Sequence, residues 1–167
     1  MRFIPLLLCL ITALSFTSKA QSINGFELDI TTHLGDQQTF YDGDRLSFLI
    51  SMGQNAHLRL IYQDAENNLI QILPSRHIPK SFYDAGFYFT VPDIKHPFQL
   101  TIRPPYGKER IWVFATTTPP TPFAGRNLKN GFRLLSDDIT ALRHHIQKQS
   151  EQFLGEAVTE IITRKLP

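Results

Sequence analysis

The residues best suited to chemistry in this chain are its histidines, which could bind a metal ion or move protons. They are His33, His57, His77, His96, His144 and His145. No H-x-x-x-H or C-x-x-C spacing accompanies them, and such spacing is what brings ligands together locally. His144 and His145 are adjacent on a predicted helix, so their side chains point about 100° apart and cannot share an ion from that helix. The pattern favours surface imidazoles, and we expect neither a metal site nor a cofactor.

The carboxylates offer little catalytic signal. Asp42 and Asp44 flank Gly43 as in part of a calcium loop, but the other ligand positions and the closing Glu are absent. Asp137 and Asp138 suit the start of a helix. The chain also has no G-x-S-x-G motif, no phosphate-binding glycine loop and no cysteine beyond Cys9. We therefore predict no catalytic residues and a protein that is not an enzyme.

Aromatic and basic residues give the better candidate site. Two of them lie in the loop "SFYDAG", and the others lie in or beside "RPPYGKER". Tyr and Arg are enriched in binding hot spots, so an exposed patch for a partner is predicted. Its residues are Phe82, Tyr83, Arg103, Tyr106, Lys108 and Arg110. The alternative is that these aromatic side chains pack in the core or at a corner of the fold.

Residues 1–20 have the pattern of a secretory signal peptide. Arg2 is followed by an apolar run from Phe3 to Phe16, and Ser18 and Ala20 supply the small residues before a cut. The run is shorter than the roughly 20 apolar residues of a membrane span. Cys9 lies inside the run and not at its end, which argues against lipid attachment. We expect cleavage after Ala20, no membrane span afterwards, and a periplasmic or secreted protein.

Charge is balanced overall but segregated along the chain. Loss of Arg2 and Lys19 with the leader leaves 15 basic and 15 acidic residues, which argues against nucleic-acid binding. Residues 21–70 contain seven acids and two bases, whereas 71–135 contain nine bases and three acids. This segregation arises by chance or marks a charge-complementary binding face.

Apolar and polar residues alternate through most of residues 25–116, which contain the predicted binding patch. Seven alternating runs occur between residues 25 and 116, at 26–30, 46–52, 58–62, 69–73, 87–91, 98–102 and 111–115. Turn residues such as those at 42–43, 64–68 and 104–107 separate them. We predict a mainly β protein, an immunoglobulin-like antiparallel β-sandwich of about seven to eight strands, over residues 21–117.

The last 50 residues lack the alternating pattern of the preceding part. Residues 118–135 are rich in Pro and Gly and are predicted to be an extended connector. A helix is predicted from Ser136, with Ser136 or Asp137 as its cap and Ile139, Leu142 and Ile146 at helical spacing. Residues 157–163 fit either a strand or a helix, with a strand favoured. The unit 136–167 is expected to pack on the sandwich.

The segments "YDGDRLSFLI", "LRLIYQDAENNLIQILPS", "DAGFYFTVPD" and "PFQLTIRPPYGKERIWVFAT" also carry a family resemblance. The pairs Gly43–Asp44, Leu73–Pro74 and Ala85–Gly86, the pair Val91–Pro92, and the Pro-x-Gly-x-Glu at 105–109 resemble the bacterial domain of unknown function family 4384, over roughly residues 38–117. The resemblance implies an envelope accessory module without established catalytic residues, and a final strand after a connector.

Together these expectations describe a non-catalytic, exported binding or assembly module of the bacterial cell envelope. It would engage an envelope protein, or a glycan, through loops or a sheet face. The alternatives are a cell-wall or glycan hydrolase with a dispersed carboxylate site, and a secreted effector or adhesin. Oligomeric state is not indicated by the residues.

Overall fold

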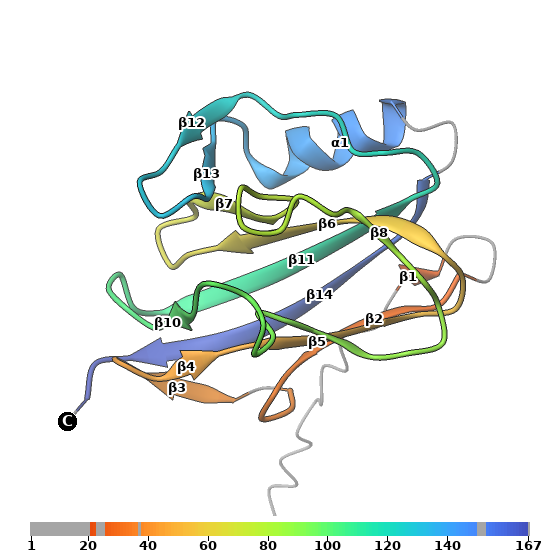
Figure 1. Ribbon diagram of the computed structural model, residues 1–167. Coiled ribbons are helices and arrows are strands. Elements are labelled where there is room, and N and C mark those ends of the chain that lie inside the picture. Colours follow the sequence, from red (N-terminus) through yellow and green to blue (C-terminus); the bar gives the residue numbers. More distant parts are fainter. Residues whose placement is uncertain (1–20, 23–25, 37, 150–152, 167) are drawn as a thin grey trace, which may run out of the picture.

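Alternating side chains place a large sheet at the centre of the molecule. The computed structural model describes residues 21–22, 26–36, 38–149 and 153–166, so the expected leader lies outside the described residues. The described residues form fourteen strands and one helix. The expectation of a mainly β, sandwich-like fold with a C-terminal helix is confirmed (Figure 1).

The central sheet has nine strands in the order β1-β14-β11-β6-β7-β13-β12, with β3 beside β14 and β8 beside β6. Its strands are β1 (Gln21–Ser22), β3 (Thr39–Tyr41), β6 (Ala56–Gln63), β7 (Leu69–Leu73), β8 (Phe82–Tyr83), β11 (Lys108–Thr116), β12 (Gly125–Asn127), β13 (Arg133–Leu135) and β14 (Phe153–Arg164). The pairs are antiparallel except β3 with β14, which is parallel and departs from the all-antiparallel expectation.

A second layer covers one face of this sheet. It consists of a three-stranded sheet and a two-stranded sheet, β2-β5-β9 and β10-β4. Their strands are β2 (Leu28–Thr32), β4 (Arg45–Leu46), β5 (Phe48–Met52), β9 (Phe89–Val91) and β10 (Leu100–Thr101). Phe48 and Ile50 of β5 are fully buried in the same core cluster as Leu60 of β6 and Ile111 of β11. Each such side chain contributes roughly 1.5–3 kcal/mol through burial, so this core holds the two layers together.

The other face of the central sheet is covered by α1 (Ile139–Gln149). Because successive strand residues point to opposite faces, Trp112 and Phe114 of β11 face α1 while Ile111 and Val113 face the second layer. Leu142 and Ile146 of α1 are buried in this second core, as their helical spacing predicts.

The helix begins later than expected, and its cap is a different residue. Asp138 Oδ1 accepts a hydrogen bond from the backbone N–H of Ala141 at 2.8 Å, and the Asp138 carbonyl accepts the N–H of Leu142 at 3.0 Å. Asp138 is therefore the N-cap, which agrees with its expected place at the helix start, whereas the prediction of Ser136 or Asp137 as the cap is wrong. An N-cap side chain must reach an N–H two or three residues onward, and only Asp138 is so placed before Ile139.

The predicted connector is also only partly extended. Residues 125–135 form the hairpin β12–β13, and β13 pairs with β7 and so extends the central sheet. Gly125 permits the hairpin, because a Cβ at that position would lie 2.2 Å from the carbonyl oxygen of Leu134. The strands have three residues each, which is too short for alternation to be recognised in the sequence.

Residues 157–163, which fit either a strand or a helix in the sequence, form part of a strand. Strand β14 spans Phe153–Arg164, longer than the predicted 157–163, and lies between β1 and β11. Its inward positions include Ala157, Thr159 and Ile161, all buried. By contrast, the predicted run 87–91 is shortened, since β9 starts at Phe89 and Phe87 is 79% exposed.

Candidate functional site

The predicted aromatic and basic patch is divided between two ends of strand β6. Phe82 and Tyr83 form β8, which pairs with His57 and Ala56 at the start of β6. Arg110 of β11 pairs with Gln63 at the end of β6. At about 3.3 Å per residue, the seven-residue separation between Ala56 and Gln63 along β6 amounts to roughly 23 Å. The structure therefore does not bring the six predicted residues into one surface.

Ion pairs reduce the charge of the predicted basic residues. Arg103 contacts Asp42 at 3.0 Å. Lys108 and Arg110 contact the same carboxylate of Glu160 at 2.8 Å and 3.2 Å. These positions carry less uncompensated charge than the sequence suggests.

The predicted aromatic residues differ in exposure. Tyr83 stacks on Phe89 with ring centroids 4.3 Å apart, and burial and then the Asp93 carboxylate raise its pKa to about 12. Phe82 is 41% exposed and contacts the ring of His57. Tyr106 is half-buried, and loss of hydration followed by the neighbouring Asp42 raises its pKa. Phe82 is thus the most accessible of the three predicted aromatic residues.

A basic surface that the sequence does not reveal forms elsewhere, where three distant segments meet. His77 Nε2 lies 2.6 Å from the carbonyl oxygen of Asn130, and the His77 ring contacts the rings of Phe98 and Phe132. The ring of His96 stacks on Phe98 at 5.8 Å. The contacts join loop 74–81, loop 92–99 and the turn of hairpin β12–β13.

Each of these segments contributes an exposed base next to a contacting residue. Arg76 precedes His77, Lys95 precedes His96 and Lys129 precedes Asn130. No ion pair between any of the three and a carboxylate of the described residues is present. We call the surface made of Arg76, His77, Lys95, His96, Phe98 and Lys129 the basic face.

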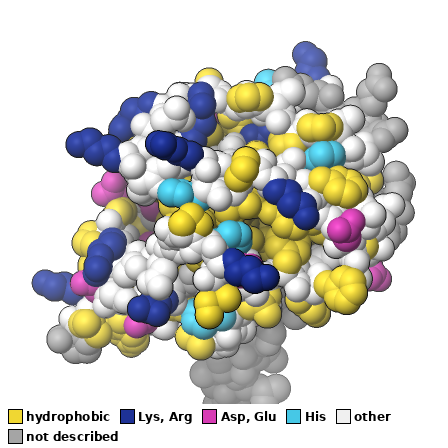
Figure 2. Space-filling model, viewed as in Figure 1, with side chains coloured by type: hydrophobic (Ala, Val, Ile, Leu, Met, Phe, Trp, Pro, Cys, Tyr) yellow, Lys and Arg dark blue, Asp and Glu magenta, His cyan; other side chains and the backbone are white. Residues whose placement is uncertain are grey.

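The carboxylate of Asp93, which lies beside the basic face, is hydrogen-bonded within its own turn. Asp93 Oδ1 accepts backbone hydrogen bonds from Lys95 at 2.7 Å and from His96 at 3.1 Å. Figure 2 shows Lys, Arg and His side chains recurring across the face turned to the viewer, with apolar side chains between them and acidic ones mainly toward its sides. The basic face therefore combines positive charge with partly exposed aromatic rings.

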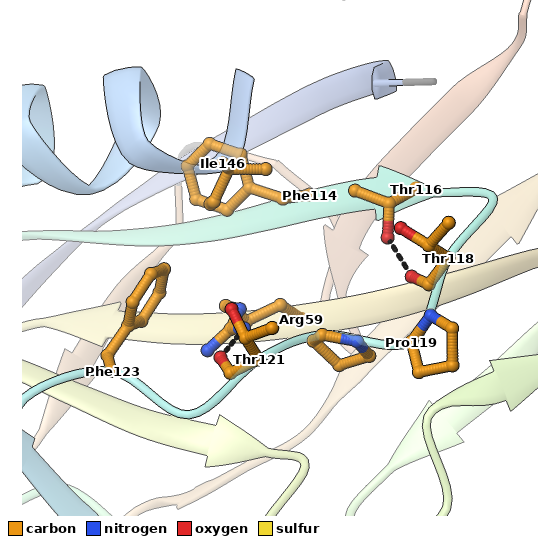
Figure 3. Close-up of a pocket in the computed structure, with 9 residues that line it drawn as sticks. Arg59, Phe114, Thr116, Thr118, Pro119, Thr121, Phe123 and Ile146 are labelled. Atoms are coloured by element: carbon orange, nitrogen blue, oxygen red, sulfur yellow. Dashed lines mark hydrogen bonds between the residues drawn. The ribbon is translucent and has the colours of Figure 1, made fainter. Parts of the chain in front are cut away.

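A small pocket lies on the opposite side of the central sheet, beneath the C-terminal half of α1. Its volume is about 50 Å³, and its lining comes from β6, β11, residues 118–123 and α1. In Figure 3, Arg59 extends past Thr121 toward Phe123, with Phe114 and Ile146 on one side and Thr116, Thr118 and Pro119 at the far end. The walls are largely apolar and the floor is cationic.

Arg59 is an unusual occupant of a sheet interior because it is only 4% exposed. Its Nη1 donates to Gln71 Oε1 at 2.7 Å, its Nη2 donates to the carbonyl of Thr121 at 2.6 Å, and its guanidinium lies 3.8 Å from the Phe123 ring centre. Burial lowers the pKa of Arg59 to about 10, so the group remains cationic at neutral pH. A charged residue between Leu58 and Leu60 of a buried strand was the available sequence signal.

A buried carboxylate lies at the other end of β11. Glu109 is 1% exposed, and it accepts hydrogen bonds from the Tyr62 hydroxyl and from Thr163 Oγ1, the latter at 2.8 Å. Burial raises the pKa of Glu109 more than these hydrogen bonds lower it. Burial also raises the pKa of Tyr62, as does the adjacent Glu109. Glu109 is not among the residues that line the Arg59 pocket or the larger hollow beside β2 and β5.

That larger hollow has a volume of about 620 Å³. Its lining includes the exposed aromatic residues Phe87 and Tyr88 and the exposed acids Glu27 and Asp29. The lining combines apolar and acidic side chains, and nothing in the structure indicates what would cover it.

The histidines and paired carboxylates hold local structure where the structure describes them. His57 Nδ1 lies 3.0 Å from Ser81 Oγ, and burial lowers the pKa of His57. Asp44 Oδ2 accepts the backbone N–H of Tyr41 at 2.7 Å, which closes the turn around Gly43. In the described part of the chain, no three His, Cys, Asp or Glu residues come together in a way that could hold a metal ion. Nor does any helix there have the length and apolarity that crossing a membrane requires.

Comparison with known proteins gives one family. Residues 39–119 match the model of the family described as "Domain of unknown function (DUF4384)", which confirms the expected resemblance and its extent. No curated protein and no solved structure gives a significant match to the chain. Several of the residues that carried the resemblance fix turns here, since Gly43 and Gly86 adopt positive φ.

Proposed function

Since the chain carries a DUF4384 domain over residues 39–119, we propose that it is an exported, non-catalytic binding module of the bacterial cell envelope. We further propose that the basic face binds an acidic segment of a protein partner. The signal-peptide pattern of residues 1–20 supports export.

The observation that carries the proposal is the convergence of Arg76, Lys95 and Lys129 around a cluster of partly exposed rings. Unpaired cations attract an acidic surface and speed its association. The half-buried rings of His77, His96 and Phe98 supply apolar contact area. A protein segment that alternates acidic and apolar side chains fits both properties, whereas an anionic glycan would use the charges and leave the rings less covered.

Charge reversal tests this proposal. A triple variant, Arg76→Glu, Lys95→Glu and Lys129→Glu, is compared with wild-type protein in affinity capture from envelope extract. The matched control is Lys148→Glu, Arg164→Glu and Lys165→Glu, which changes net charge equally at exposed positions on other elements. We expect wild type and control to capture the same protein and the first variant to lose it.

Equal capture by all three proteins would contradict the proposed surface. Capture of an anionic polysaccharide by wild type and control, without a protein, would assign the basic face to a glycan instead. Binding that persists unchanged in about 0.5 M salt would also count against it, because exposed charges are screened at that ionic strength.

A further inference from the structure

The Arg59 pocket has a charge that the described residues do not balance. Buried charges in proteins are normally paired, since transfer of an ion out of water is costly. No carboxylate of the described residues lies within ion-pairing distance of Arg59. Its hydrogen-bond acceptors are an amide and a carbonyl, which are neutral. The described residues thus leave this guanidinium without a counter-charge.

Arg59 also has N–H donors that the described residues do not use. A guanidinium carries five N–H donors, and the hydrogen bonds within the described part of the chain use two of those on Arg59. A second arginine adds to the excess, because Arg133 of β13 pairs directly with Gln71, the residue that accepts from Arg59. Arg133 Nε is buried and has no hydrogen-bond partner among the described residues. Two cations therefore flank Gln71 on this side of the sheet.

The pocket's size and walls restrict what could neutralise this charge. A volume of about 50 Å³ holds only a few non-hydrogen atoms, given that one water requires roughly 10–15 Å³ on the same scale. A planar carboxylate matches both this size and the forked donors of a guanidinium. Phe114, Pro119 and Ile146 would surround the aliphatic stem that carries it. A nucleotide or a sugar ring is too large for the space.

We propose that the Arg59 pocket binds a carboxylate group on a short aliphatic stem, with Arg59 as its counter-ion. The carboxylate comes either from a free small acid or from the C-terminus of a peptide, and both present the same chemistry. The pocket shares no residue with the basic face, so this inference does not depend on the proposed function.

The test is a titration of the purified protein followed by NMR of backbone amides at constant ionic strength. Propionate is the probe, and propionamide is its neutral match. We expect saturable shifts at the non-proline residues of 116–123, which are Thr116, Thr117, Thr118, Thr121 and Phe123, with propionate and none with propionamide. The tripeptide Ala-Ala-Ala with a free C-terminus is then compared with its C-terminal amide. At least tenfold tighter binding of the free peptide than of propionate identifies a peptide as the source, and equal binding identifies a small acid.

Two variants locate the site. Arg59→Met should weaken propionate binding at least tenfold. Because Arg59 is buried and its loss could prevent folding, Thr118→Trp provides a second variant that blocks the pocket from an exposed position. The neighbouring exposed Thr117→Trp is the matched control and should bind as wild type does. Equal shifts with propionate and propionamide, absence of shifts at 116–123, or unchanged binding by Thr118→Trp would each overturn the proposal.

Discussion

Arg59 and Glu109 are ionisable side chains that are almost completely buried. Both lie on long strands of the central sheet, and neither has an ion-pair partner among the described residues. Their environments differ, because Arg59 borders a cavity while Glu109 is enclosed by Tyr62 and Thr163. We therefore assign a ligand to Arg59 and a structural role to Glu109.

The raised pKa of Glu109 predicts a pH-dependent stability. The folded-state pKa lies above the ordinary value of 4.5, so protonated Glu109 stabilises the fold fully below that value. This stabilisation is lost as the pH rises through the folded-state pKa. A tenfold difference in proton affinity between the folded and unfolded chains corresponds to about 1.4 kcal/mol. In Glu109→Gln we expect the free energy of unfolding to rise relative to wild type between pH 4 and pH 8.

Urea unfolding of wild type and variant at both pH values measures this difference. Glu66→Gln, an exposed change in the hairpin turn after β6, serves as control and should follow wild type at both. A constant difference between wild type and Glu109→Gln across the pH range would show that Glu109 ionises freely in the fold.

For individual residues, the sequence predicts turns better than it predicts binding surfaces. The prediction of a turn at residues 42–43 is correct, because Gly43 adopts positive φ and the turn is closed locally by the bond from the Tyr41 N–H to Asp44. The basic face escaped prediction because its three cations come from segments that only the fold brings together. The cations that were predicted as a patch have acidic partners, Asp42 and Glu160, far away in the sequence.

Among the elements, α1 closes the face of the sheet that holds the Arg59 pocket. Leu142 is fully buried between α1 and the sheet. A buried Leu→Ala change typically costs about 2–5 kcal/mol, and we expect Leu142→Ala to lower the free energy of unfolding by that amount. It should also increase amide exchange of Phe114, which packs beneath the helix.

Thr140→Ala, at an exposed position on the same helix, should stay within about 0.5 kcal/mol of wild type. Chemical denaturation compares the two variants. If Leu142→Ala were as stable as Thr140→Ala, α1 would not be docked on the sheet.

Long alternating elements were predictable, and short ones were not. Strands β6 and β11 and the hairpin turn at Asp64–Asn68 follow the sequence pattern, with the Asp64 N–H bonded to the Asn68 carbonyl at 3.1 Å. The hairpin β12–β13 has three-residue strands, and its pairing with β7 is a tertiary interaction. Residues 157–163 are compatible with a helix locally, and pairing with β11 decides for a strand.

For the whole molecule, the proposed export predicts a processed N-terminus. Protein recovered from the periplasm or culture medium of its host should begin at Gln21, because Ser18 and Ala20 provide the small residues that a signal peptidase needs. N-terminal sequencing or intact mass measures this directly. A chain that retained Met1 would contradict the proposed leader.

The segregation of charge along the chain has a counterpart in space. The excess of bases after residue 70 includes Arg76, Lys95 and Lys129 of the basic face. Other bases from the same region pair with acids, such as Lys108, at the start of β11, with Glu160 of β14. The surface charge is therefore uneven, as a module that recognises an acidic partner requires.

The most direct test of this account is the dissociation constant of the captured partner for wild type and for the variant Arg76→Glu, Lys95→Glu and Lys129→Glu. At about 0.05 M salt we expect at least a hundredfold loss of affinity in the variant. We also expect weaker wild-type binding at about 0.3 M salt, as charges on an exposed face require. Equal dissociation constants for the two proteins, independent of salt, would contradict the claim that the basic face is the binding surface.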